Sequence, residues 1–83
     1  MNLNDVIVVR VFNYQDDADS NYFKCFKTKV DSTLRKIVKK YGIDKDKTNE
    51  FIEDFKTYFP LYADCTAMCL EDYGGLDYGI DVI

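Results

Sequence analysis

The sequence predicts a small α+β domain, in which a small mixed sheet packs against two amphipathic helices in the order β-β-α-α-(β)-β. Three observations predict it: a β-branched run near the start, two segments with helical spacing of apolar residues, and a Gly-Gly turn before a short apolar end. With 83 residues, 47% of them hydrophobic, the chain is expected to form one domain, residues 1–83, around a thin core.

The first predicted strand is the run Val6–Phe12, which is apolar and mostly β-branched. Such a run is typical of a central strand covered on both faces. Residues 13–21 are polar and are predicted to form a loop. Residues 22–30 fit a second strand, because Phe23 and Cys25 alternate with lysines, but their four-residue apolar spacing also fits a helix. The strand is preferred because the Asp, Ser and Thr residues that follow suit a helix start better than a helix interior.

The first predicted helix begins at Asp31 or Ser32 as its cap and ends at Tyr41. Gly42 can take the left-handed conformation that ends a helix, and Ile43 then folds back on the last turn. Basic side chains occupy the outer face. The apolar stripe comprises Leu34, Ile37, Val38 and Tyr41.

The second predicted helix begins at Asp46 or Thr48 and ends before Pro60. Its apolar stripe is Phe51, Ile52, Phe55, Tyr58 and Phe59. Residues 61–73 fit either a third strand or a short helix. Gly74-Gly75 is predicted to be a turn, and residues 76–83 a closing strand or ordered tail.

Charges are sorted into blocks along the chain. Residues 24–47 hold nine basic side chains against three carboxylates, a net +6, whereas residues 48–83 carry one lysine against eight carboxylates, a net −7. The whole chain has a net charge of −4. One basic face and one or more acidic faces are therefore expected, and such a polarised surface steers charged partners.

Several classes of function are disfavoured by residues that the sequence lacks. Without histidine, no Ser-His or Cys-His nucleophile pair can form, and no glycine-rich phosphate loop is present. We therefore expect no enzyme, no catalytic residue and no cofactor. No apolar run is long enough for a membrane span, and no signal peptide is recognisable, so a cytoplasmic, reducing location is expected.

The three cysteines are an odd count at low density, which argues against a disulfide scaffold. Cys65 and Cys69 form a C-x₃-C pair that could join Cys25 or Asp64 around a soft metal. Structural zinc normally takes four ligands, and isolated cysteines are more often small buried hydrophobes. No metal site is therefore predicted.

The segment from Val30 to Ile43 resembles the ubiquitin-like β-grasp superfamily, in which a strand runs into a Ser/Thr-capped helix ending in Gly and an apolar residue. Leu70–Tyr73 and Leu76–Ile80 resemble the late turn region of that superfamily. The resemblance implies a central final strand. Within the superfamily, Ras-association modules present basic side chains from the second strand and first helix to an acidic partner, often by pairing strand edges.

The predicted function is a non-enzymatic protein–protein interaction module that uses a basic strand–helix face to bind an acidic partner protein. The alternative is a small acidic, viral-type inhibitor that blocks a nucleic-acid-binding protein by mimicking phosphate charge. Direct nucleic-acid binding is disfavoured by the net charge, no membrane partner is expected, and the oligomeric state stays open. The partner-binding residues are Lys24, Lys27, Lys29, Arg35, Lys36, Lys39 and Lys40. The alternative acidic face is Glu71, Asp72 and Asp77.

Overall fold

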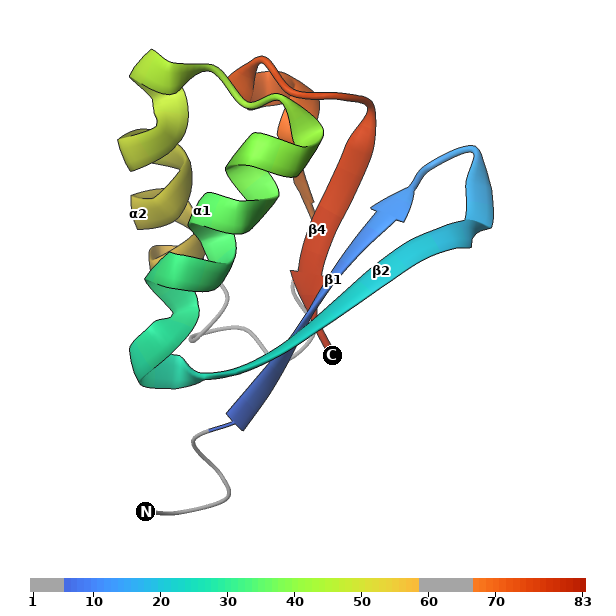
Figure 1. Cartoon of the computed structure of the whole chain (residues 1–83). Helices are drawn as coiled ribbons and strands as arrows, with labels where there is room; N and C mark the ends of the chain where they lie inside the picture. Colours follow the sequence, from blue (N-terminus) through green and yellow to red (C-terminus); the bar gives the residue numbers. More distant parts are fainter. Residues whose placement is uncertain (1–5, 59–66) are drawn as a thin grey trace.

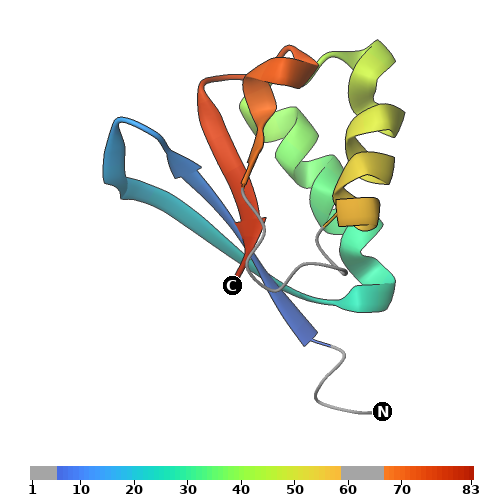
Figure 2. The ribbon, with the colours of Figure 1, turned by 180° about the vertical axis from the view of Figure 1, so that it is seen from behind.

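A four-stranded sheet and two helices form two layers, with both helices on the same face of the sheet (Figure 1). The view from behind shows the same two layers (Figure 2). This computed structural model describes residues 6–58 and 67–83. The strands are β1 (Val6–Asn13), β2 (Asp16–Phe26), β3 (Met68–Cys69) and β4 (Tyr78–Val82), and the helices are α1 (Val30–Tyr41) and α2 (Thr48–Tyr58). Short 3₁₀ helices are η2 (Lys27–Lys29), η3 (Lys45–Lys47) and η4 (Leu70–Tyr73).

The predicted α+β class and element order are confirmed, but the sheet is antiparallel and not mixed. Its order is β2-β1-β4-β3, and each described pair of neighbours runs antiparallel. The short η4 turn reverses the chain between β3 and β4, which makes that pair antiparallel. β4 then enters between β1 and β3, so the final strand is central.

The prediction of a loop over residues 13–21 was wrong, because β2 already begins at Asp16. A tight turn joins the two strands: the side-chain oxygen of Asn13 accepts the amide of Gln15 at 2.9 Å. The Asp16 carboxylate accepts the amide of Ala18 at 3.1 Å. The polar side chains that suggested a loop instead make hydrogen bonds within a turn and an edge strand. The strand preferred for residues 22–30 is confirmed as far as Phe26, where η2 begins.

β1 is central, as predicted, but it is not covered on both faces by the described part of the chain. Val9 and Val11 are fully buried, whereas Val8 and Arg10, which alternate with them, are partly exposed. This two-residue period arises because α1 and α2 lie on the same face, so alternate residues of β1 point away from them.

The end of α1 is confirmed and its predicted cap is not. The helix starts at Val30 after Lys29, without a side-chain cap. It ends at Gly42, whose φ of 72° is left-handed, and the amide of Ile43 then donates to the carbonyl of Val38 at 3.1 Å. The preceding 3₁₀ turn leads directly into α1, which explains why Asp31 and Ser32 lie inside the first turn.

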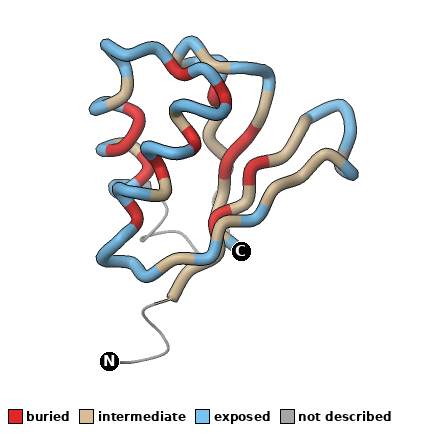
Figure 3. Tube along the Cα trace, viewed as in Figure 1, coloured by how far each residue is buried: buried red, intermediate tan, exposed pale blue. Residues whose placement is uncertain are grey.

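The core lies between the two layers, where the buried positions of Figure 3 face one another. Both predicted helical stripes contribute to it, although Val38 is only half-buried. The side chains of Tyr58, Phe59 and Pro60, together with residues 61–66, lie outside the described part of the chain. The core residues are Val9, Val11, Val30, Leu34, Ile37, Tyr41, Ile43, Phe51, Ile52, Phe55, Leu70 and Ile80.

Residues 70–77 are held against the ends of both helices. The amide of Asp44 donates to the carbonyl of Tyr73 at 3.0 Å, and that of Leu76 donates to the carbonyl of Tyr41 at 2.9 Å. The Tyr73 hydroxyl donates to the Asp54 carboxylate on α2 at 2.6 Å. The predicted Gly-Gly turn is confirmed, since Gly74 has a φ of 84°. Neither helix of the described residues has the length and apolar character that crossing a membrane requires.

Candidate functional site

The seven predicted partner-binding residues are all exposed, but they do not form one face. Lys24, Lys29 and Lys36 surround a hollow between β2 and α1. Arg35 and Lys39 lie on the other side of α1, toward α2. The remaining two, Lys27 and Lys40, line neither hollow, so the predicted basic face is divided by α1 into two separate groups.

The hollow between β2 and α1, here called the strand–helix groove, has a volume of about 450 Å³. Three lysines contribute to its wall, and no carboxylate does so among the described residues. Its apolar part comes from Val6, Cys25 and Phe26, of which Phe26 is 42% exposed. The complete lining is Val6, Lys24, Cys25, Phe26, Lys29, Ser32, Thr33 and Lys36.

Local structure brings these residues together from three consecutive elements. Lys24 and Phe26 are two residues apart on β2, so both side chains project from the same face of the strand. Lys29 comes from η2, and Lys36 lies one helical turn after Ser32 on α1. The carboxylate of Asp31, in the first turn of α1, pairs with Lys56 of α2 at 3.2 Å. That pairing directs its charge away from the groove.

The backbone of β2 adds an unpaired edge to this groove. The amide of Ile83 donates to the carbonyl of Val8, so Val8 directs its backbone groups toward β4. Lys24 is the partner of Val8 across the β1–β2 pair, and such a pair does not share hydrogen bonds. The backbone groups of Lys24, and of Tyr22 two residues earlier, therefore point out of the sheet. Among the described strands, β2 has a neighbour only in β1.

A second basic hollow of about 530 Å³ lies between α1 and α2. Arg35 and Lys39 line it together with Lys45, which the sequence did not single out as a site residue. Lys40 instead lies near the rings of Phe23 and Tyr41, with its Nζ 6.0 and 5.8 Å from their centroids. These contacts separate Lys40 from both hollows.

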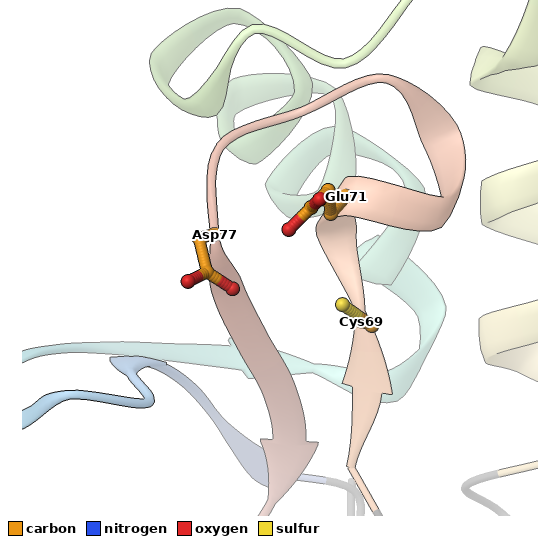
Figure 4. A group of neighbouring side chains, drawn as sticks. All are labelled: Cys69, Glu71 and Asp77. Atoms are coloured by element: carbon orange, nitrogen blue, oxygen red, sulfur yellow. The ribbon is translucent and has the colours of Figure 1, made fainter.

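The three predicted acidic residues lie together at the start of β4 and on η4. Glu71, Asp72 and Asp77 are all exposed. The Sγ of Cys69 and carboxylate oxygens of Glu71 and Asp77 lie within 4.8 Å of one another. Figure 4 shows these three side chains beside one another. Burial raises the pKa of nearby Tyr14, and the charges of Cys69 and Asp77 raise it further. This end of the molecule therefore concentrates negative charge.

The metal-ligand set considered from the sequence is not brought together by the described residues. Cys25 lies on β2 and Cys69 on β3, with β1 and β4 between them in the sheet. Cys65 and Asp64 lie outside the described residues. The Cys69 thiol and its two carboxylate neighbours could offer ligand atoms, but both carboxylates are exposed and free to move into water.

The strand–helix groove and the three acidic residues lie at opposite ends of the molecule. The end of β2, η2 and the start of α1 are at the bottom of Figures 1 and 2, whereas η4 and the start of β4 are at the top of both. The apolar part of the groove was not predicted as a site, because sequence patterns do not show which apolar residues stay exposed. No protein-family model matches the chain, and no curated protein or solved structure is significantly similar to it.

Proposed function

We propose that this chain is a non-enzymatic protein-binding module whose strand–helix groove takes an acidic segment of a partner protein. One observation carries the proposal: three lysines and the exposed Phe26 line the same groove, and no described carboxylate lines it. Three lysines alone would indicate only a solvated protein surface. Their combination with Phe26 and Val6 supports a binding role, because apolar contacts supply affinity while charges supply specificity and association rate.

The outward-facing backbone groups of Tyr22 and Lys24 support a contact with an extended segment. An edge strand can pair with a strand of another chain, and lysines on such an edge repel a strand that carries positive charge. The resemblance to Ras-association modules favours the same surface. The ubiquitin-like β-grasp assignment stays a prediction: the central β4 supports it, whereas the order and number of the strands and the antiparallel sheet depart from it.

The proposal is tested with two variants, which reverse the charge of two basic residues on either one side of α1 or the other. Lys29→Glu with Lys36→Glu, here the groove variant, is expected to weaken partner binding at least about tenfold and to flatten its salt dependence. Arg35→Glu with Lys39→Glu, here the helix variant, changes the net charge equally and should change the dissociation constant less than about threefold.

The partner is identified by capture from the native host and then titrated in purified form at several salt concentrations. Thermal unfolding of each variant controls for loss of structure, since exposed substitutions usually change stability by about 0.5 kcal/mol or less. Equal binding by the groove variant and the parent chain contradicts the proposal.

The acidic end supports a second candidate function, inhibition of a nucleic-acid-binding protein by phosphate mimicry. The supporting observation is the exposed group of Glu71, Asp72 and Asp77. It is the weaker candidate because Asp81 pairs with Arg10 at 2.5 Å and the basic segment reduces any uniform negative field. Only this candidate predicts that the three matching amide substitutions abolish inhibition of such a target. Undiminished inhibition by the triple amide variant would eliminate it.

A further inference from the structure

We infer that the acidic segment taken by the strand–helix groove belongs to a second copy of this chain, so that copies associate head to tail. This inference rests on the proposed function and names the partner. The segment is the acidic loop, defined as residues 71–77, which runs from η4 to the start of β4. Because it begins as a 3₁₀ turn and is not extended, this contact uses the side chains of the groove and not the backbone edge of β2. Its features are complementary to those of the groove in charge and in apolar contact.

The acidic loop carries an exposed apolar side chain among carboxylates. Leu76 is 55% exposed, and it is followed directly by the exposed Asp77. Glu71 and Asp72 precede it on η4 and are also exposed. An exposed apolar side chain on a loop with three carboxylates matches a groove lined by Phe26 and three lysines. Charge complementarity and a matched apolar contact thus favour this loop as the occupant.

The backbone of the acidic loop is held in place before any contact forms. The amide of Gly75 donates to the carbonyl of Leu70 at 3.0 Å, and that of Leu76 to the carbonyl of Tyr41 at 2.9 Å. Gly74 takes a left-handed conformation with a φ of 84°. A loop fixed in this way loses little conformational entropy on binding, which favours association.

The groove and the loop cannot meet within one molecule, because they lie at opposite ends of the two-layer structure (Figure 1). A contact between two different surfaces is heterologous: each copy keeps one free groove and one free loop. Association therefore continues into chains unless the rotation between neighbours closes a ring. Because the contact uses a single loop, we expect a dissociation constant in the micromolar range or weaker, rising with salt.

The test uses two variants, each with one damaged surface. The groove variant retains an intact acidic loop, and Glu71→Gln with Asp77→Asn, here the loop variant, retains an intact groove. In sedimentation equilibrium at low salt, the parent chain should form species larger than a dimer as its concentration rises. Each variant alone should be monomeric, with a self-dissociation constant at least about tenfold higher than that of the parent chain.

An equimolar mixture of the two variants should form a 1:1 dimer and no larger species, because only one pair of intact surfaces remains. The helix variant, with the same charge change as the groove variant, should associate like the parent chain. A parent chain that stays monomeric at millimolar concentration and low salt overturns the inference, as does a mixture that stays monomeric.

The failure of this inference and of the proposed function are distinguishable. If the parent chain is monomeric while a host protein binds it and not the groove variant, the proposed function stands and the second copy is excluded. If a host protein binds the groove variant and the parent chain equally, the proposed function fails whatever the oligomeric state.

Discussion

Phe51→Ala is expected to unfold a large fraction of the protein. Phe51 is 0% exposed, and its ring packs edge-to-face on Tyr73 with centroids 5.3 Å apart. It thereby joins α2 to η4 within the core. Replacing a buried Phe by Ala costs about 3–5 kcal/mol, through lost burial and the cavity left behind. Small domains are stable by only about 5–15 kcal/mol, so this change removes much of the total.

Urea denaturation of the parent chain and the variant measures this loss. Phe26→Ala is the matched control, because it removes the same atoms from a side chain that is 42% exposed. The control should cost about 1 kcal/mol or less while weakening partner binding at the groove. If the two variants lose the same free energy of unfolding, the placement of Phe51 in the core is wrong.

Gly74→Ala is expected to have the next largest effect on stability, a loss of about 1–2 kcal/mol. Gly74 has a φ of 84°, which disfavours any side chain. An added Cβ would also meet the carboxylate of Asp44, but that carboxylate ends an exposed, flexible side chain and can rotate away. Gly42 is the matched control: its φ is 72°, but an added Cβ would meet no described atom within 4 Å. Gly42→Ala should therefore cost only the conformational strain, about 1–2 kcal/mol.

A double-mutant cycle tests whether Asp44 contributes to the cost at Gly74. In an Asp44→Ala background the carboxylate is absent, and the cost of Gly74→Ala should stay close to that of Gly42→Ala. The amide and carbonyl of Asp44, which bond to Tyr73 and to the first turn of α2, are unaffected by that background change. A cost of Gly74→Ala that falls by more than about 1 kcal/mol without the Asp44 carboxylate would contradict this account.

Local sequence patterns predicted most elements because their causes are local. The helical spacing of Leu34 and Ile37 defines α1, and Gly42 ends it through a conformation that few other residues adopt. The stripe containing Phe51 and Phe55 defines α2 in the same way. The hairpin was misjudged because polar residues such as Asn13 and Asp16 serve turns and edge strands as well as loops.

The candidate site was predicted in its charges and not in its shape. Lys36 and Lys39 are three residues apart and were predicted to share one basic face. They line separate hollows because one side of α1 is next to β2 and the other side is next to α2. Phe26 entered no predicted site, since its exposure depends on which elements surround the end of β2. Charge is a property of the residue, whereas exposure is a property of the packing.

The sequence by itself determined the α+β class, the order of the elements, the two helical stripes and the block-wise separation of charge. Each depends on residues close together in the chain. The tertiary structure alone decided the antiparallel sheet, the single buried face of β1 and the groove that three lysines and Phe26 line together. The tertiary structure also decided that the strand–helix groove and the acidic loop lie at opposite ends. Contacts between residues far apart in the chain determine how the sheet and the helices pack against each other.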